Sequence, residues 1–81
     1  MIWEKKTFDL ELDCRGLNCP LPVLKTKLTM DKLDFGKVLK IISTDAGSKN
    51  DIVAWADKSG NTIISKQDNE GELTFFIQKG K

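Results

Sequence analysis

Four segments of the chain have the side-chain pattern of β-strands. Residues 8–13 alternate strictly between apolar and acidic side chains, which is the repeat of a half-buried strand. Residues 37–43 are rich in β-branched side chains and predict an interior strand. Residues 61–67 and 72–78 predict a hairpin whose turn is Asn69-Glu70-Gly71.

A first helix is predicted between the first two strands. Gly16 interrupts the strand pattern, and Pro20 and Pro22 then open a helix that extends to about Asp34. Proline is tolerated in the first helical turn because the N–H groups of that turn have no partner within the helix. Gly36 is expected to end this segment.

A second helix is predicted between the second strand and the hairpin. Ser48 and Asp51 have the Ser-x-x-acid spacing of a capping box, in which both side chains satisfy backbone N–H groups at a helix start. Gly60 fits the position just after the helix. The apolar face of this helix is expected to consist of Ile52, Trp55 and Ala56.

The order of these elements, β-α-β-α-β-β, predicts an α+β fold. The first crossover makes the first two strands parallel if they share a sheet, with a right-handed connection. The compact solution is a two-layer α/β sandwich, in which both helices cover one face of a four-stranded mixed sheet. The other face would stay open, and residues 1–81 would form one domain.

The first helix has two apolar stripes, and the second of them allows two interpretations. It either widens the surface that faces the core, or it forms a docking patch for a partner beside Cys19, because contiguous exposed apolar surface usually marks an interface. Lys25 and Lys32 flank it on the solvent side. The stripe expected to contact the core consists of Val23, Thr26, Met30 and Leu33, and the second stripe consists of Leu21, Leu24 and Leu28.

Charge and composition narrow the possible functions. Thirteen basic residues nearly cancel twelve acidic ones, and Arg15 is the single arginine, so direct nucleic-acid binding is not expected. The absence of histidine excludes Ser-His and Cys-His nucleophile pairs and removes the commonest metal ligand. No apolar run is long enough for a membrane span, and residues 1–6 do not resemble a signal peptide, so a cytoplasmic protein with reduced cysteines is expected.

Cys19 directly precedes the predicted first helix and is predicted to be a reactive thiol rather than an inert buried cysteine. The thiolate is the nucleophile, and a free cysteine with a pKa near ~8.5 is mostly protonated at neutral pH. Backbone N–H groups and the positive end of the helix dipole lower the pKa of cysteines at helix N-termini to roughly 3.5–7.5. Pro20 and Pro22 remove two of these N–H groups but rigidify the turn, and Arg15 is expected to add a positive charge.

Cys14 ends the first predicted strand, and its role is open between two interpretations. It is either a small residue that packs at a strand end or a resolving thiol for Cys19, although the spacing does not match a Cys-x-x-Cys motif. Two thiolates with Asp13 or Asp45 could in principle hold a metal ion. Without paired cysteine spacing or histidine, no metal site is predicted.

Residues 12–23, Leu-Asp-Cys-Arg-Gly-Leu-Asn-Cys-Pro-Leu-Pro-Val, resemble the signature of the TusA (SirA-like) sulfur-carrier family, whose hallmark is Cys-Pro-x-Pro. The likeness continues through Gly36-Lys37, the strand ending in Asp45, the Asp51-Ile52 pair and Gly60-Asn61. It therefore covers essentially the whole chain. Two positions depart from many members of the family, which lack the cysteine found here at Cys14 and often have histidine in place of Asn61.

The resemblance implies a two-layer α/β sandwich, related in shape to the C-terminal domain of translation initiation factor three. It also implies that Cys19 accepts sulfane sulfur as a persulfide and passes it to a partner protein. In the best-known member the donor is a cysteine desulfurase of the IscS type and the acceptor is a DsrE-like sulfur relay complex, in a relay that ends in 2-thiolation of the wobble uridine of tRNA. Other members resemble carriers in sulfur oxidation or molybdenum-cofactor supply.

The expected molecule is thus a monomeric carrier that needs no cofactor and is not an independent turnover enzyme. Cys19 would hold the sulfur, and partner contacts would come from Leu21, Leu24, Lys25 and Leu28. Pro20, Pro22, Arg15, Cys14 and Asp45 would support the site. Two alternatives belong to other classes: a thiol–disulfide redox module using Cys14 and Cys19, and a nucleic-acid or ribosome-binding module suggested by fold analogy alone.

Overall fold

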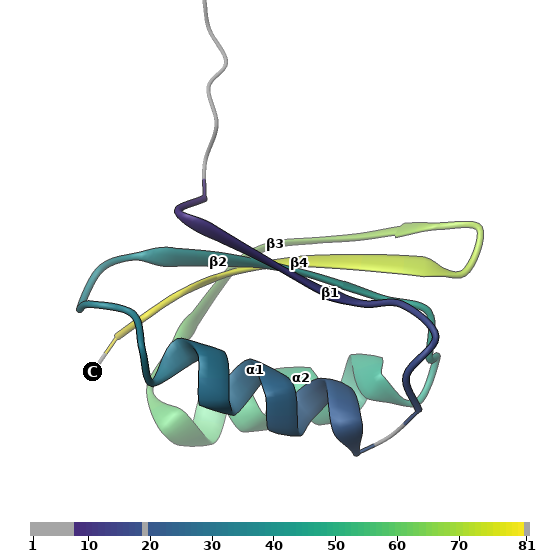
Figure 1. The fold of residues 1–81 in the computed structure, drawn as a ribbon, viewed down its shortest axis with the longest axis horizontal. Coiled ribbons are helices and arrows are strands. Elements are labelled where there is room, and N and C mark those ends of the chain that lie inside the picture. Colours follow the sequence, from purple (N-terminus) through teal and green to yellow (C-terminus); the bar gives the residue numbers. More distant parts are fainter. Residues whose placement is uncertain (1–7, 19, 81) are drawn as a thin grey trace, which may run out of the picture.

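The computed structural model describes residues 8–18 and 20–80, and it has the predicted order of elements. Both helices lie against one face of a four-stranded mixed sheet, which confirms the predicted α+β sandwich (Figure 1). The elements are β1 (Leu10–Cys14), α1 (Leu21–Met30), β2 (Val38–Ser43), α2 (Ser48–Ser59), β3 (Thr62–Asn69) and β4 (Glu72–Gln78).

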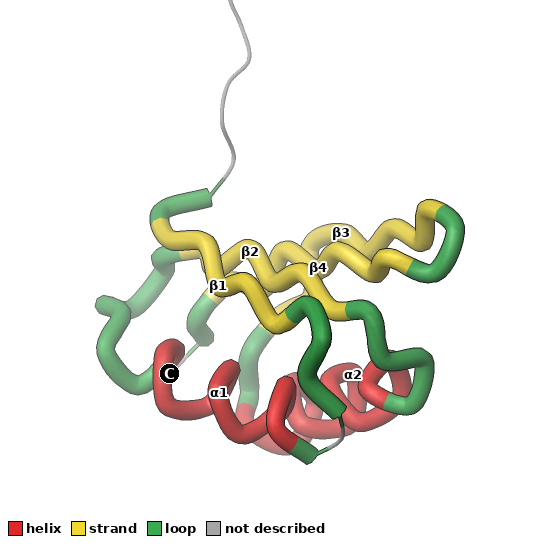
Figure 2. The backbone as a smooth tube through the Cα atoms, turned by 45° about the vertical axis from the view of Figure 1, so that its right-hand side comes forward, coloured by secondary structure: helices red, strands yellow, loops and turns green. Residues whose placement is uncertain are grey.

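The strands are arranged in the order β1-β2-β4-β3. β1 and β2 are parallel, as predicted, and β4 is antiparallel to both β2 and β3. Each helix starts just after the carboxyl end of one of the two parallel strands, so α1 and α2 run in the same direction and begin at the same end of the molecule (Figures 1 and 2). The loops after β1 and β2 therefore lie beside each other at that end (Figure 2).

The hydrophobic core fills the space between the sheet and the two helices. Alternate residues of β2 and β4 point toward the helices and are almost fully buried: Leu39, Ile41, Leu73, Phe75 and Ile77. The predicted inner faces of the helices are confirmed, because their residues are buried or half-buried against this cluster. These residues are Val23, Thr26 and Met30 of α1, Leu33 in the turn that follows it, and Ile52, Trp55 and Ala56 of α2.

Two predicted boundaries differ from the structure. β1 begins at Leu10, two residues later than predicted, and Phe8 packs its ring against Phe76 of β4, with ring centroids 6.0 Å apart. The regular part of α1 ends at Met30 rather than near Asp34. The chain then tightens into turns, in which the N–H groups of residues 32 and 33 donate to carbonyls three residues earlier.

The predicted capping box of α2 was wrong. Ser48 is already inside the helix, and its hydroxyl donates a 2.9 Å hydrogen bond backward to the Asp45 carboxylate. The hairpin turn is also tighter than predicted, since β3 extends to Asn69 and only Glu70 and Gly71 connect the strands. Both turn residues have positive φ, +52° and +90°, which matches the right-handed twist of the two strands.

The open face of the sheet is covered by its own charged side chains. Arg15 pairs with Asp13 at 2.9 Å and reaches Glu72 of β4 at 3.7 Å, so its side chain spans β2. Ile42 of β2, which points to this face, remains only 7% exposed. Nearby, the Lys40 ammonium lies 5.2 and 5.9 Å from the ring centroids of Phe8 and Phe76. Cation–π contacts and ion pairs thus shield the apolar centre of this face.

Candidate functional site

The loop between β1 and α1 carries the sequence Asn18-Cys19-Pro20. It leaves β1 in a tight turn, in which Leu17 N–H donates to the Cys14 carbonyl and Gly16 has a φ of +82°. Glycine adopts this left-handed conformation without the steric penalty of a Cβ atom. Leu17 then packs half-buried against the core, which anchors the loop.

A hydrogen bond links this loop to the loop that follows β2. Gly16 N–H donates to the Thr44 hydroxyl at 2.9 Å. Because β1 and β2 are parallel neighbours, their carboxyl ends meet at one edge of the sheet. The start of α1 is therefore positioned against two loops that are joined to each other.

Cys19 lies outside the described residues, so the site is described from its neighbours in the sequence. Leu21 N–H donates to the Asn18 carbonyl at 2.9 Å, and Pro20 is the N-cap of α1. In the first turn, Pro20 and Pro22 have no N–H, and that of Leu21 is used by Asn18. The positions of Pro20, Leu21 and Pro22 therefore offer no free amide at the start of α1, so fewer amides are available there than the helix pattern suggested.

Cys14, the other thiol, is fully buried in the core cluster. Burial raises the pKa of the Cys14 thiol, and the Asp13 carboxylate raises it further, whereas Lys25 partly offsets these effects. A thiol with a raised pKa forms little thiolate at neutral pH and is a poor nucleophile. The geometry supports the interpretation of Cys14 as a packing residue.

Arg15 was expected to bring a positive charge to Cys19. Its guanidinium forms two hydrogen bonds to Asp13, Nε to Oδ1 at 3.0 Å and an Nη to Oδ2 at 2.9 Å, on the open face of the sheet. These bonds raise the pKa of Arg15 and lower the pKa of Asp13 from 3.8 to about 2. The positive charge of Arg15 is thus compensated by carboxylates.

Asp45 forms hydrogen bonds that fix the start of α2. Its backbone carbonyl accepts the Ser48 N–H at 3.0 Å, and its carboxylate accepts the Ser48 hydroxyl. Across residues 8–18 and 20–80, no three cysteine, aspartate or glutamate side chains gather in a way that could hold a metal ion. In the same ranges, no helix is both long and apolar enough to cross a membrane.

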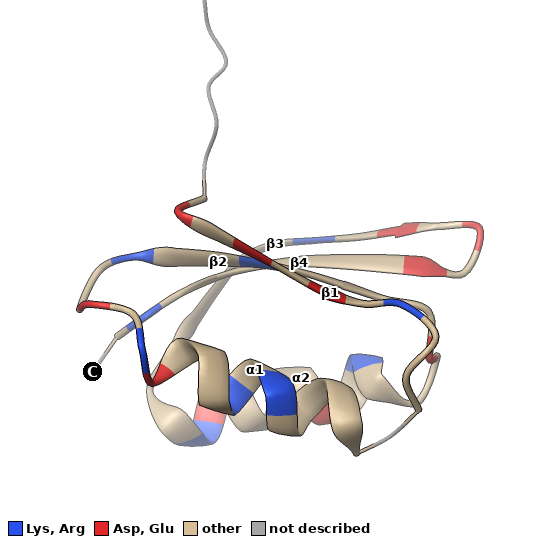
Figure 3. Ribbon diagram, viewed as in Figure 1, with Lys and Arg blue, Asp and Glu red and all other residues tan. Residues whose placement is uncertain are grey.

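The second stripe of α1 is exposed, so it does not widen the surface that faces the core. Leu21, Leu24 and Leu28 are 43%, 48% and 53% exposed, respectively. Lys25 lies on the same outer side. In Figure 3, α1 carries basic residues, whereas β1 and the β3–β4 hairpin carry acidic ones. We refer to these three leucines as the leucine stripe; it forms an apolar, basic-flanked surface that begins two residues after Cys19.

Sequence reasoning missed a groove between α1 and α2. It has a volume of about 510 Å³ and starts at Pro20, the residue that follows Cys19. Trp55 could have indicated this groove in part, because tryptophan is large and is rarely buried completely; here it remains half-buried. The groove is lined by Pro20, Val23, Lys27, Asp51, Ala54, Trp55, Lys58 and Ser59.

Comparison with solved structures defines the fold class. The crystal structure of a SirA-like protein from Desulfitobacterium hafniense superposes with a TM-score of 0.79, covering 90% of this chain and all of that one. The two sequences are 21% identical, so this similarity concerns the fold alone. The two-layer sandwich described above is thus the fold of a SirA-like protein.

Comparison of sequences identifies the family. The family model described as Sulfurtransferase TusA matches residues 10–79. The sulfur carrier protein TusA of Allochromatium vinosum is 44% identical over 72 residues, which cover 89% of this chain and 95% of that protein. YrkI of Bacillus subtilis, whose name marks it as a candidate sulfur carrier, is 42% identical over 89% of this chain and 96% of its own length. The chain belongs to the TusA family of sulfur carrier proteins.

Proposed function

We propose that this protein accepts sulfane sulfur as a persulfide on Cys19 and relays it to a partner protein. The observation that carries the proposal is the contrast between the two thiols of a sulfur-carrier chain. Cys14 is buried in the core with a raised pKa, whereas Cys19 precedes α1 in the sequence, two residues before the first leucine of the exposed stripe. A sulfur atom that must move between proteins needs a cysteine that a partner can reach, not one that is buried in the core.

The transfer is a nucleophilic displacement at sulfur. The Cys19 thiolate attacks the outer sulfur of a donor persulfide, a new S–S bond forms, and the donor's inner sulfur leaves as a thiolate with the bonding electron pair. The positive end of the α1 dipole favours the negative charge of the thiolate and of the resulting persulfide. In the second half of the relay, an acceptor thiolate takes the outer sulfur and Cys19 leaves as the thiolate.

The resemblance to the TusA family suggests the partners. The donor would be a cysteine desulfurase or another persulfide donor, and the acceptor a DsrE-like relay protein. The recipient pathway would be tRNA 2-thiolation, sulfur oxidation or molybdenum-cofactor supply, in the cytoplasm. The leucine stripe with Lys25 supports docking, because exposed leucines that contribute nothing to the core are free to be buried against a partner.

The decisive experiment is intact-protein mass spectrometry after incubation with a cysteine desulfurase and cysteine. The wild-type chain should gain one sulfur atom that a reductant removes, and Cys19→Ser should gain none. Cys14→Ser is the matched control. It should still load sulfur, although burial of a serine hydroxyl in this core site should cost about 1–3 kcal/mol of stability.

The same pair of variants separates carriage from redox chemistry. A thiol–disulfide module would lose its reaction in both variants, since its disulfide needs both cysteines. Loss of loading in Cys14→Ser, with the fold intact by circular dichroism, would therefore contradict the carrier proposal. Absence of sulfur on the wild-type chain from any persulfide donor would also refute it.

A further inference from the structure

β3 forms one of the two outer edges of the sheet. In the strand order β1-β2-β4-β3, it pairs with β4 on one side only. An outer edge presents backbone N–H and C=O groups with which another strand can pair. A bulge between Ile63 and Ser65 shifts the register, and residues 65–69 then continue regularly to the turn. The part of this edge that another strand could extend is therefore residues 65–69.

The hairpin turn determines which backbone groups of β3 point to the outer edge. Its two residues lie between Asn69 and Glu72, which form the closing pair of the ladder. The closing pair of a two-residue hairpin is hydrogen-bonded, and the pairs of an antiparallel ladder alternate between bonded and non-bonded. Every second residue of β3, counted back from Asn69, therefore directs its backbone groups to β4. The backbone groups of Lys66 and Asp68 point to the outer edge.

These two residues carry opposite charges. Lys66 and Asp68 are exposed, and across residues 8–18 and 20–80 neither forms an ion pair. The Oδ1 atom of Asp68 accepts the Gly71 N–H at 3.2 Å, which leaves Oδ2 for a second partner. Both side chains line a hollow of about 150 Å³ beside Lys49, near the start of α2. This part of the edge thus has room for the side chains of a further strand.

A second copy of the same edge fits this charge pattern in one register. Two β3 strands that pair antiparallel about a twofold axis at Gln67 place Lys66 of each copy opposite Asp68 of the other. Both residues direct their backbone groups to the edge, so the pairing has the alternation that an antiparallel ladder requires. The neighbouring registers with the same alternation place Lys66 opposite Lys66, or Asp68 opposite Asp68. Like charges that face each other directly are destabilising, so only one register is favoured.

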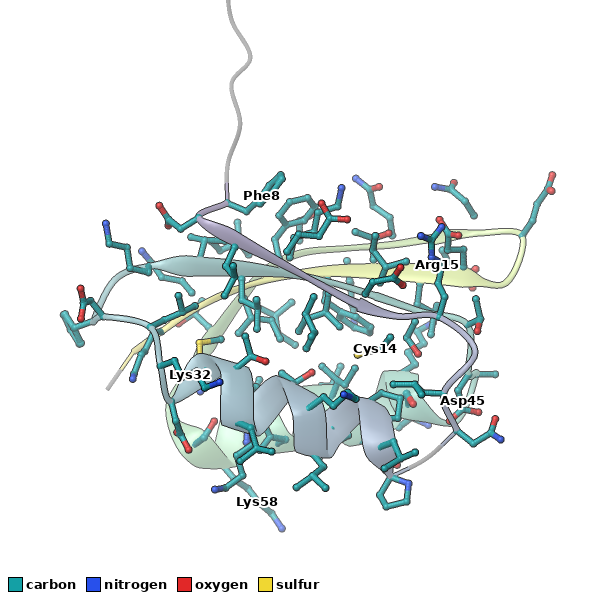
Figure 4. The ribbon with its side chains drawn as sticks, viewed as in Figure 1. Phe8, Cys14, Arg15, Lys32, Asp45 and Lys58 are labelled. Carbon is teal, nitrogen blue, oxygen red and sulfur yellow. The ribbon has the colours of Figure 1, made fainter. Side chains whose placement is uncertain are left out.

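The other outer edge of the sheet lacks this self-complementarity. Two β1 strands that pair antiparallel, with their apolar residues on one face, bring Glu11 and Asp13 opposite acidic residues of the other copy. Arg15 pairs with Asp13 on the side of the sheet away from the helices, where Figure 4 shows it. Bulges and charged side chains usually protect an edge from pairing, but the charges of β3 have both signs and those of β1 only one.

We infer that two copies of this chain pair through β3 and form one continuous sheet, with four strands from each copy. The paired segment is short, so the dimer is weak and forms at high protein concentration. It replaces the monomer that the sequence led us to expect. α1 packs against β1 and β2, at the other end of the strand order, so the leucine stripe stays exposed in both copies. The inference does not depend on the proposed function.

Charge reversal combined with sedimentation velocity tests the register. From about 10 μM to about 1 mM, the average mass of the wild-type chain should rise toward twice that of one chain. Lys66→Glu and Asp68→Lys each bring like charges opposite each other, and each should raise the dissociation constant about tenfold at low salt. An equimolar mixture of the two variants should dimerise again. In the mixed pair, the new carboxylate faces the new ammonium group, and the unchanged Asp68 faces the unchanged Lys66.

The matched control reverses a charge elsewhere. Lys58→Glu alters an exposed lysine of α2 whose side chain points away from the sheet (Figure 4), and it should leave the dissociation constant unchanged. Circular dichroism checks that every variant is folded. A wild-type chain that is monomeric throughout, a dimer that survives both reversals, or a mixture that stays monomeric would overturn the inference. A dimer that Leu24→Ser/Leu28→Ser dissociates would also overturn it, because that dimer would use the leucine stripe.

Amide hydrogen exchange distinguishes strand pairing from other contacts between copies. The N–H groups of Lys66 and Asp68 should exchange more slowly at high protein concentration than at low concentration, and in Lys66→Glu this difference should disappear. The N–H of Gln67 is directed to β4 and should be protected at both concentrations. A dimer in which the exchange of Lys66 and Asp68 does not depend on concentration would contradict pairing through β3.

Discussion

The outer face of α1 and the open face of the sheet both carry apolar side chains on the outside of the molecule. These side chains are covered on the sheet but exposed on α1. On the sheet, charged side chains cover the apolar centre, so that Ile42 is only 7% exposed. On α1, the leucine stripe is 43–53% exposed, and the lysines beside it leave it uncovered. The centre of the sheet face is covered by its own side chains, whereas the leucine stripe is apolar surface that another molecule could bury.

This difference supports the proposed docking of a partner on α1. Binding to the sheet would require the ion pairs of Arg15 and the Lys40–aromatic contacts to be displaced, and their loss would offset the gain. Binding to α1 displaces only water from the leucines. The start of α1 is also the place where Cys19 joins the helix, so the surface that is free to bind lies beside the proposed reactive sulfur.

The largest expected effect concerns the covered face. Ile42→Ala should reduce the free energy of unfolding by about 2–4 kcal/mol, because it removes buried methylene and methyl groups and leaves a cavity. Urea denaturation measures the change. The matched variant Leu28→Ala of the stripe should change stability by less than about 0.5 kcal/mol. Similar losses in both variants would show that the two faces do not differ as described.

The next effect concerns function. Leu24→Ser/Leu28→Ser should slow sulfur loading from a cysteine desulfurase about tenfold, because the partner loses apolar contact area, while unfolding is unchanged. Phe35→Ser provides the control, since Phe35 is 74% exposed and lies beyond the other end of α1. If Phe35→Ser slowed loading as much, the stripe would not be a specific docking surface.

The smallest effect concerns the charges that cover the sheet. Hydrogen bonds from Arg15 lower the pKa of Asp13 from 3.8 to about 2, so they stabilise the folded state above pH 3.8, where the carboxylate is ionised in both states. This stabilisation should decline as the pH falls and be lost once Asp13 is protonated in the folded state as well. Arg15→Gln should be slightly less stable than the wild type at pH 7 and equally stable below pH 2. A difference that is constant across this range would contradict the assignment.

The sequence predicted the regular parts of the fold because their signals are local. Alternation gave the strands, the two prolines marked the start of α1, and Gly60 ended α2 in the left-handed conformation. The predicted capping box at Ser48 was incorrect because the Asp45 carboxylate accepts the hydrogen bond of the Ser48 hydroxyl. The pairing of Arg15 with Asp13 likewise involves a carboxylate that the local pattern of the sequence did not indicate.

By itself, the sequence determined the order of the elements, the inner faces of both helices and the family to which the chain belongs, since repeats and motifs lie within short stretches of chain. Only the tertiary structure decided that Cys14 is buried, that the leucine stripe is exposed, and that a groove opens between α1 and α2 beside Pro20. These properties depend on which surfaces the sheet and the neighbouring helix cover. A helix of this length has apolar residues on more sides than one sheet can bury, and packing selects the side that remains for a partner.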